Sequence, residues 1–524
     1  MLFRTPRVSY RLLAACLALA AGGPAWAQLR VATWNISSYS GDAGRTAPIQ
    51  TVVYGVFDGR SMAPDIILGQ EFLSSAAMTT FKNALNSAPG SPGDWEGVFV
   101  AGPPTDTEGN AFLYRTSKVV YLGYVIASQG GAAPLPPRNT PRFKVQLQGY
   151  TSQKAVLCCY STHMKAGTAA DDKTRRQTEA TNIRNNAELL SPDWSFLLGG
   201  DYNIYTNTET AYQELIGSQA NNEGRFFDPI NSTGNWHDNS AYRFVHTQDP
   251  VASNGGMDDR FDQLLVSDNL IEGDGLSYIG NASIPYSTTT WNDANHSYRS
   301  WGNDGTSFNT GLTTTGNTMV GATIAQAIIT CATTAGGHIP LFLDLRVPAE
   351  VDSDLVIDFG QVPQNATAQA TLEVWNAGNV ALWNAAGIDL LRYTLAASTG
   401  FTAPGDNFTD AAGDPHNAHV ITMDTSTPGT KSGTVTITSN APDEPGRVVT
   451  LLGEVMAPSG CPGDMNCDGN VRFSDIDLFV EALAGQSAWT HSPCPWQNGD
   501  CNGDGNVTFA DIDPFVSLIG TLCP

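Results

Sequence analysis

The chain has 524 residues, 41% of them hydrophobic, and a formal net charge of −24 at pH 7. A chain of this length does not fold around a single hydrophobic core, so we expect about three domains. The acidic balance argues against a broad electrostatic grip on nucleic acid, but it allows a local phosphate site held through bound cations.

The first 27 residues predict a secretory signal peptide. Arginines among the first eleven residues precede an apolar run over 12–21, and Ala25-Trp26-Ala27 has the small-x-small form of a signal peptidase site. We therefore expect a secreted mature chain from Gln28, extracellular or associated with the cell surface. A lipoprotein box ending at Cys16 is the alternative, but the apolar run continues after that cysteine. No other stretch has the ~18 to 20 apolar residues that cross a bilayer, so no transmembrane segment is expected.

Acidic residues and cysteines are unevenly distributed. Residues 28–348 contain 20 basic and 29 acidic side chains, whereas residues 349–524 contain 4 and 22. Export permits disulfides, and the odd number of cysteines on each side implies either a free thiol on each side or a bridge between domains. Pairing is expected in the last segment, with its connectivity open. The cysteines after the signal are Cys158, Cys159, Cys331, Cys461, Cys467, Cys494, Cys501 and Cys523.

Residues 28–348 predict one large α/β domain. Short β-like runs are separated by polar stretches rich in Gly and Asn, and residues 173–190 have a helical pattern. Many strands with a few long helices favour an α/β sandwich, in which two sheets pack face to face and helices cover the outside. The main β-like runs are 29–33, 65–68, 112–114, 156–160, 195–198 and 263–266.

Residues 352–456 predict a small all-β sandwich. The runs 369–374 and 433–438 alternate apolar residues with Thr or charged residues, as expected for strands with one buried face. The phrases at 357–363, 374–379 and 438–443 resemble immunoglobulin-like repeats of bacterial surface proteins and ciliary proteins. The segment has no catalytic cluster, and a spacer role is favoured.

Residues 459–524 contain a duplication, because Gly-Asp-Met-Asn-Cys-Asp-Gly-Asn-Val at 463–471 recurs 36 residues later as Gly-Asp-Cys-Asn-Gly-Asp-Gly-Asn-Val at 499–507. In an EF-hand-type loop, oxygens at positions 1, 3, 5 and 12 and a backbone carbonyl at 7 surround a hard cation, and Gly at position 6 permits the turn. Both repeats therefore predict Ca²⁺ sites. The expected ligands are Asp464, Asn466, Asp468, Asn470 and Asp475 in calcium loop 1, and Asp500, Asn502, Asp504, Asn506 and Asp511 in calcium loop 2.

An apolar helix is expected after each loop, over 476–483 and 512–519. With Asp at position 12, the segment resembles type I dockerin domains, small α-helical modules with paired calcium loops that dock onto cohesin modules. The resemblance implies a cohesin-like or cell-surface partner, and a calcium-stabilised terminal cap is the alternative. Arg472 stands at position 9 of the first loop, where small polar residues are usual, which weakens that site.

Polar side chains end successive apolar runs of the first domain. Phosphodiester hydrolysis requires a divalent cation, an activated water and groups that stabilise the leaving oxygen, all in one cleft. Each motif alone is weak, because an Asn after a strand is usually a turn residue and a lone His is usually structural. Their shared placement at strand ends makes the set informative. The candidates are Asn35, Glu71, His163, Asp201, Asn203, Asp262 and His338.

In this order the motifs resemble the endonuclease/exonuclease/phosphatase superfamily of DNase-like enzymes, over nearly all of residues 29–347. The resemblance implies a four-layer α/β sandwich and hydrolysis of phosphate esters. It also implies that Asn35 and Glu71 hold an essential divalent ion, Mg²⁺ or Mn²⁺, with Glu71 as its chief ligand.

The same resemblance implies roles for the other candidates. Asp201 and Asn203 would orient the attacking water and the phosphate. His338 would be the general base, with Asp262 fixing its tautomer, and His163 would donate a hydrogen bond to the scissile phosphate. Three more residues follow from the family pattern: Tyr114 as a catalytic side chain, Arg142 as a phosphate contact and Glu108 as the carboxylate partner of His163.

The last motif departs from the family pattern. Members usually have Ser-Asp-His there, whereas this chain has Gly336-Gly337-His338, so the carboxylate beside the base is missing. If that carboxylate supports a second metal or a rigid turn, its loss reduces activity or changes the ion requirement.

We therefore expect a secreted, metal-dependent phosphodiester hydrolase, an endonuclease or phosphodiesterase with a calcium-binding docking tail. Nucleic acid is the first substrate candidate and phospholipid the second, since the sequence shows no obvious exposed apolar hairpin for a bilayer. The alternatives are a sphingomyelinase-type or phosphatase-type member of the same fold and a non-catalytic surface or adhesion protein.

Overall fold

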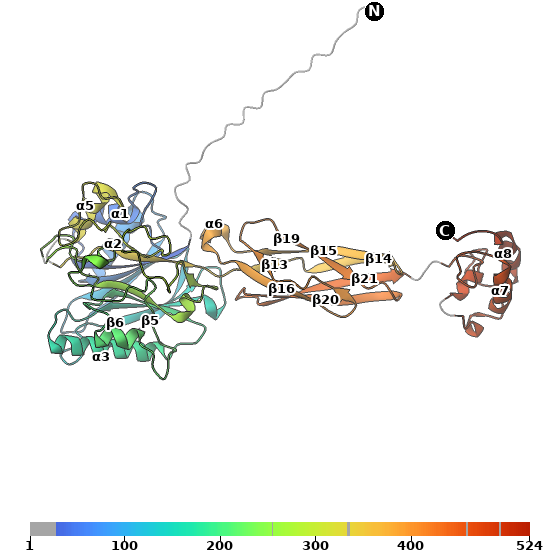
Figure 1. Ribbon diagram of the computed structural model, residues 1–524, viewed down its shortest axis with the longest axis horizontal. Coiled ribbons are helices and arrows are strands. Elements are labelled where there is room, and N and C mark those ends of the chain that lie inside the picture. The colour runs from blue at the N-terminus through green and yellow to red at the C-terminus, as the bar shows by residue number, and fades with distance from the viewer. Residues whose placement is uncertain (1–27, 254, 333–335, 457–459, 492–493, 524) are drawn as a thin grey trace, which may run out of the picture.

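The computed structural model describes residues 28–253, 255–332, 336–456, 460–491 and 494–523. They form an α/β part (28–348), a β-sandwich part (349–456) and a C-terminal part (460–523), coloured from blue to red in Figure 1. The predicted signal peptide, residues 1–27, lies outside the described residues. Within the described ranges, no helix is long and apolar enough to cross a membrane.

The first sheet of the α/β part is built around two parallel strands, β1 and β2. Its order is β10-β12-β1-β2-β4-β3, and β11 pairs with β12. Residues 29–37 of β1 are all buried, which is expected for a strand covered on both faces. The bounds are β1 (Leu29–Tyr39), β2 (Ile66–Phe72), β3 (Trp95–Val100), β4 (Gly109–Arg115), β10 (Ser277–Tyr278), β11 (Arg299–Ser300) and β12 (Leu341–Arg346).

The second sheet has the order β5-β6-β7-β8-β9, in which β7 and β8 are parallel and fully buried. Its inner face packs on the first sheet through a core that includes Leu68 and Phe112 on one side and Phe143 and Leu157 on the other. The bounds are β5 (Val119–Ser128), β6 (Thr140–Leu147), β7 (Val156–His163), β8 (Ser195–Asp201) and β9 (Asp262–Val266).

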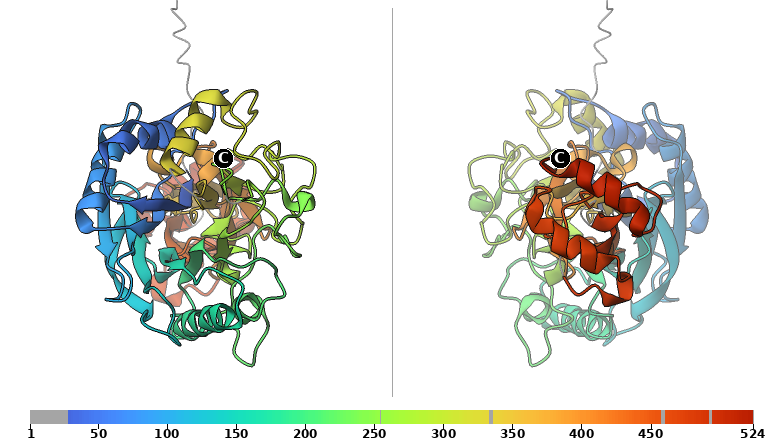
Figure 2. Two further views of the ribbon diagram at one scale, coloured as in Figure 1. Left: turned by 90° about the vertical axis from the view of Figure 1, so that its left-hand side faces the viewer. Right: turned by 90° about the vertical axis from the view of Figure 1, so that its right-hand side faces the viewer.

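Helices cover the outer face of each sheet. α1 (Thr46–Tyr54), α2 (Ser75–Ser87) and α5 (Gly321–Ala332) share a core with the first sheet. α3 (Ala170–Ala187) and α4 (Thr210–Ile216) share a core with the second. The order is helices, sheet, sheet, helices, as Figures 1 and 2 show. The expectation of a mixed α/β architecture with packed sheets is confirmed.

Two sheets also pack face to face in the β-sandwich part. One has the order β13-β15-β19-β17 and the other β14-β21-β20-β16-β18, and residues such as Leu372, Leu391, Ile421 and Leu451 fill the space between them. The bounds are β13 (Val351–Ser353), β14 (Val356–Pro363), β15 (Ala368–Asn376), β16 (Leu391–Ala397), β17 (Phe401–Thr402), β18 (Phe408–Asp410), β19 (Asn417–Met423), β20 (Gly429–Ser439) and β21 (Gly446–Met456), with helix α6 (Val380–Trp383) after β15.

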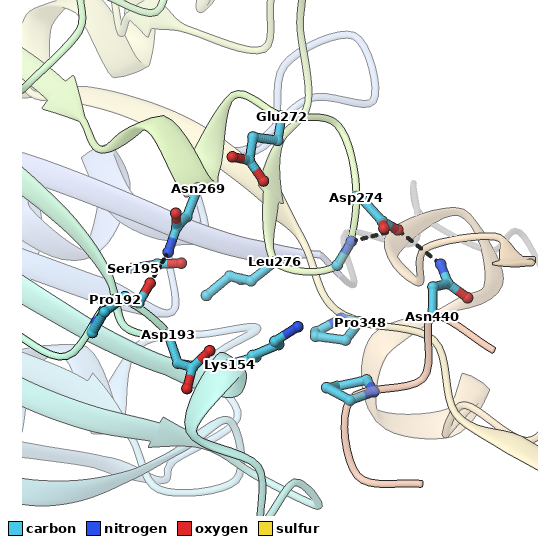
Figure 3. A pocket seen from close by; sticks show the side chains of 12 residues that line it. Lys154, Pro192, Asp193, Ser195, Asn269, Glu272, Asp274, Leu276, Pro348 and Asn440 are labelled. Carbon is cyan, nitrogen blue, oxygen red and sulfur yellow. Dashed lines mark hydrogen bonds between the residues drawn. The ribbon is translucent and has the colours of Figure 1, made fainter. Parts of the chain in front are cut away.

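Hydrogen bonds join the α/β part to the β-sandwich part. The carboxylate of Asp443 accepts from the backbone N–H groups of Thr151 (2.9 Å) and Ser152 (2.6 Å). Asp274 accepts from Arg392 (2.9 Å) and Asn440 (2.8 Å) across the same junction. Figure 3 shows Asp274 and Asn440 facing each other beside a cavity of about 240 Å³. These polar contacts flank an apolar one, because Trp383 and Ile388 are buried in the same core as Val347 of the α/β part.

The C-terminal part contains helices α7 (Ile476–Ala482) and α8 (Ile512–Leu518), which begin where the sequence places them. Phe479 and Phe515 stack with their ring centroids 4.2 Å apart and form the centre of a small core. Because this core is small, cross-links matter for its stability. Disulfides join Cys461 to Cys523 and Cys467 to Cys494, and the free thiols are Cys158, Cys159, Cys331 and Cys501.

We predict that Asp443→Ala loosens the junction without unfolding either part. The freed N–H groups of Thr151 and Ser152 can bond to water, so stability should change by less than about 0.5 kcal/mol, while proteolysis between residues 347 and 352 accelerates. Limited proteolysis and small-angle scattering measure this. Asp424→Ala is the control, because Asp424 accepts from Ser426 within its own turn. Equal proteolysis of both variants would contradict the prediction.

Candidate active site

The candidate residues meet at one edge of the two sheets because of strand register. His163 at the end of β7 pairs with Asp201 at the end of β8, and Asp201 pairs with Asp262 at the start of the antiparallel β9. On the facing sheet, Asn35 of β1 pairs with Gln70, next to Glu71, on β2. Every one of these strands brings its polar residue to the same edge. A hydrogen bond of 3.3 Å from Asn35 Nδ2 to Asp201 Oδ2 links the two sheets.

A β-bulge in β2 directs the side chain of Glu71 toward this edge. The registers of β1 with β2 and of β2 with β4 both shift around Glu71, and its φ is +61°, which is unusual for a residue with a side chain. Its Oε1 accepts from Asn35 Nδ2 at 2.8 Å, and its Oε2 accepts from Ser38 N at 2.7 Å. Such strain at a polar cluster points to a functional constraint on the position of the carboxylate.

Glu71, Glu108 and His163 form a cluster suited to a divalent cation. One ligand atom of each lies within 4.8 Å of the others. His163 Nδ1 is buried without a hydrogen-bond partner, 3.7 Å from Glu108 Oε2. The two carboxylates are ligands that suit Mg²⁺ or Mn²⁺, whereas an imidazole nitrogen is a ligand more typical of softer ions. The residues present therefore fit the ion that the sequence motifs imply.

Asn35 lies beside the cluster with its amide nitrogen toward the carboxylates. Asn35 Oδ1 accepts from Ser37 N at 3.1 Å, and the amide nitrogen faces Glu71 and Asp201. In this orientation Asn35 donates to both carboxylates and holds them in place. The role of Asn35 as a ligand of the ion stays a prediction.

His338 and Asp262 form a buried acid–base pair. His338 Nδ1 lies 2.6 Å from Asp262 Oδ2, and its Nε2 lies 3.5 Å from Asp201 Oδ2. Burial disfavours the charged imidazole, but Asp262 and Asp201 outweigh burial and raise the pKa of His338. Burial likewise raises the pKa of Asp201, to about 7, and the neighbouring Asp262 and Glu71 carboxylates add to the effect. These four groups are close enough for the protonation of one to change that of the others.

Asn203 and His163 lie beside this pair as uncharged donors. Asn203 adopts φ +50°, with its N–H donating to Asp201 Oδ1 at 3.0 Å and its Nδ2 to the Met164 carbonyl at 3.1 Å. Burial, with Arg138 and His338 nearby, lowers the pKa of His163 well below its usual value. His163 is therefore neutral at pH 7, and its Nε2 is 3.4 Å from Asp201 Oδ2.

Tyr114 and Arg142 are not brought to this edge. Tyr114 pairs with Ile66 at the opposite end of β2 from Glu71, and its ring stacks on Phe112. Arg142 lies on β6, and its Nη1 donates to Asn186 in helix α3. Antiparallel pairing explains the position of Tyr114, since residues later in β4 lie progressively farther from the polar edge. Arg142 lies near the start of β6, opposite Tyr160, but its side chain faces α3.

Arg138 and Gln248 lie at the site, and the sequence motifs did not indicate them. Arg138 Nη2 is 2.6 Å from Glu108 Oε2, and Gln248 Nε2 is 3.1 Å from His338 Nε2. Both come from long loops, where periodicity carries no information about position. The Pro136-Pro137 pair before Arg138 is the one local signal that its backbone is restrained.

Packing explains the glycine before His338. A Cβ at Gly337 would lie 2.6 Å from the Cβ of Ala332 and 2.7 Å from its carbonyl oxygen, at the end of α5. The preceding Gly336 has φ +79°, and its N–H donates to Asp249 Oδ2 at 3.2 Å. The turn is therefore held by Asp249 from another loop, and α5 occupies the space that a side chain at 337 would need.

The sequence matches no family model and no curated protein. Among solved structures, it is similar to the human Nocturnin catalytic domain with bound sulfate anion, with 14% identity over 61% of this chain and 94% of that chain and a TM-score of 0.35. An endonuclease/exonuclease/phosphatase family protein from Bacteroides thetaiotaomicron is 15% identical over 61% and 94%, with a TM-score of 0.34. An endonuclease/exonuclease/phosphatase from Beutenbergia cavernae is 13% identical over 81% and 100%, with a TM-score of 0.34.

We predict that Gly337→Asp destabilises the protein by about 1 to 3 kcal/mol, because the new side chain overlaps Ala332 and forces α5 to shift. Urea denaturation measures the loss. Gly446→Ala is the control, since no atom lies within 4 Å of its added Cβ. Unchanged stability of the Gly337 variant would show that α5 yields freely and that the glycine has another cause.

Proposed function

We propose that the α/β part is a metal-dependent hydrolase of phosphodiesters. The buried His338–Asp262 pair, beside Asp201 and the Glu71, Glu108 and His163 cluster, carries this proposal. A base held by a carboxylate next to a cation site is the arrangement that activates water against phosphate. The order of the strand-end motifs, which resembles the endonuclease/exonuclease/phosphatase superfamily, supports the same reaction class.

Each residue has a distinct part in the proposed reaction. His338 Nε2 accepts the proton of the attacking water, while Asp262 keeps the proton on Nδ1. His163 and Asn203 present neutral N–H groups to the phosphate oxygens. Glu71, Glu108 and His163 would hold the cation, which supplies positive charge to the phosphate and lowers the pKa of bound water. Asn35 fixes Glu71 in the orientation that this requires.

A phospholipid substrate is the second candidate, and a surface feature favours it. The hairpin of β5 and β6 exposes Leu122, Tyr124 and Val125 by 48%, 46% and 42%, and Leu135 in its connecting loop by 43%. The same loop continues to Arg138 at the active site. The sequence alone does not predict an exposed apolar hairpin, because the pattern of these residues is that of an ordinary strand followed by a Pro-rich loop. Nucleic acid remains the first candidate on the motif order.

For the rest of the chain, we propose secretion, a spacer and a calcium-dependent docking tail. The β-sandwich part is the immunoglobulin-like spacer. In the C-terminal part, the side chain of Asp475 accepts from the N–H groups of Met465 and Asn466, and Asp511 does the same for Cys501 and Asn502. Each carboxylate thus lies beside the first residues of its own loop, and position 12 is a ligand position in calcium loops of the EF-hand type, which supports the proposal.

An exposed apolar face supports a docking role for this tail. Phe473 and Phe509, at equivalent positions of the two repeats, are each 80% exposed, and Val480 and Val516 are each 58% exposed. Exposed apolar residues repeated in this way mark an interaction surface. A cohesin-like module is the proposed partner.

We predict that the purified mature chain cleaves at least one of DNA, RNA, sphingomyelin or bis-p-nitrophenyl phosphate when Mg²⁺ or Mn²⁺ is present. EDTA should abolish the activity. His338→Ala and Glu71→Gln should each reduce kcat/KM by about 100-fold or more, because one removes the base and the other a cation ligand. His416→Ala, at an exposed histidine of the β-sandwich part, is the control.

The pattern across substrates separates the candidates. Cleavage of sphingomyelin without cleavage of nucleic acid would favour the phospholipid function. No hydrolysis of any of the four substrates with any ion would refute the enzyme and leave the surface or adhesion protein as the explanation.

We predict that the full chain, stripped with EDTA, binds two Ca²⁺ ions in the C-terminal part. Asp475→Ala and Asp511→Ala should each remove one site, since each removes a position-12 carboxylate. Saturation at about 1,000 times Kd should stabilise this part by about 4 kcal/mol per site, or about 8 kcal/mol for both sites. Isothermal titration and calorimetric melting measure both effects. Asp477→Ala, an exposed carboxylate on α7 outside the loop, should retain both sites.

A further inference from the structure

Gln248 lies in a backbone segment that is fixed from both sides. Thr247 N donates to the Asp259 carbonyl at 2.7 Å, and Ile339 N donates to the Thr247 carbonyl at 3.0 Å. The segment is thus a short bridge between the residues before β9 and those around His338. Because its backbone is held on both edges, the half-buried side chain of Gln248 has a defined starting point beside the imidazole.

The amide of Gln248 has only one favourable orientation. Its Nε2 is 3.0 Å from the Gly336 carbonyl oxygen and 3.1 Å from His338 Nε2. A flipped amide would place Oε1 against the Gly336 carbonyl, and two acceptors would then face each other at hydrogen-bond distance. The carbonyl of Gly336 therefore selects the orientation in which the amide donates to both neighbours.

The hydrogen bond from Gln248 and the carboxylates around His338 favour different protonation states of the imidazole. Asp262 of β9, Asp201 of β8 and Glu71 of β2 all favour a protonated imidazole, and Asp259 adds negative charge nearby, while His163 acts in the opposite sense. An imidazole already protonated at Nε2 cannot accept a proton from water. An amide N–H aimed at Nε2 forms a hydrogen bond only when that nitrogen has a free lone pair.

We propose that Gln248 is a positioning residue for His338, which favours the unprotonated form of Nε2 and directs this nitrogen toward the active site. The role of Gln248 in turnover rests on the proposed hydrolase function. The Gly336-Gly337 turn also has a role in this arrangement, since the Gly336 carbonyl accepts a hydrogen bond from the amide and fixes its orientation. A residue that only filled space would need neither hydrogen bond.

Three variants test the proposal in the full chain. Gln248→Met keeps the length of the side chain and removes the donor, whereas Gln248→Glu replaces the donor with an acceptor. Gln153→Met is the matched control, because Gln153 contacts Trp194 far along the second sheet. The substrate is bis-p-nitrophenyl phosphate, and kcat/KM is measured against pH.

The expected result is a shift in the acid limb of the pH profile. Without the donor, the protonated imidazole gains relative stability. The midpoint of the acid limb of kcat/KM should therefore move to higher pH, by about one pH unit in Gln248→Met. The shift should be larger in Gln248→Glu, and at high pH the Met variant should regain activity. The control should match the wild type. A uniform fall in kcat/KM with an unchanged limb would overturn the proposal and indicate a structural role.

An NMR titration separates this proposal from the proposed function. Selective ¹⁵N-histidine labelling of the metal-free chain, with the His338 signal assigned through His338→Ala, reports the titration of His338 without any substrate. The midpoint should rise in both Gln248 variants and stay constant in Gln153→Met. If the wild type cleaves nothing, the hydrolase fails while this shift still tests Gln248. Equal midpoints in all variants would refute the role of Gln248.

Discussion

Carboxylates crowded at one buried edge of two sheets are the constraint on which the rest of the site depends. Asp201 and Asp262 are buried beside the partly exposed Glu71, and a buried charge is costly without a donor or an opposite charge. Asn35 and Ser38 donate to Glu71, the Asn203 N–H donates to Asp201, and His338 lies against Asp262. The left-handed backbone at Glu71 and Asn203 is the local strain that this arrangement carries.

The sequence predicts most of this edge because the information is local. A polar residue that directly follows an apolar strand lies at the end of that strand, so Glu71, His163 and Asp201 follow from pattern alone. Family position predicts Tyr114 and Arg142 at the site, but antiparallel pairing carries Tyr114 away from the edge, and the Arg142 side chain faces α3. Arg138 and Gln248 reach the site from long loops, and no periodicity encodes where such loops return.

The three parts of the chain differ in how much of their structure is determined by residues close together in the sequence. The proposed calcium loops are defined by residues within twelve positions, so their candidate ligands can be named from the sequence. The two disulfides span separations of 62 and 27 residues, and their pairing required the fold. The polar contacts of the junction come from single carboxylates such as Asp443, which have no distinguishing pattern in the sequence.

Cys158 and Cys159 are neighbours on β7, yet their thiols face different layers. Cys159 belongs to the core between the sheets, and Cys158 belongs to the core under helix α3. Both are buried, and burial raises the pKa of the Cys158 thiol to about 11, which makes it a weak nucleophile. One strand thus carries two reporters of assembly, because each thiol loses access to alkylating reagents only when its own layer has closed.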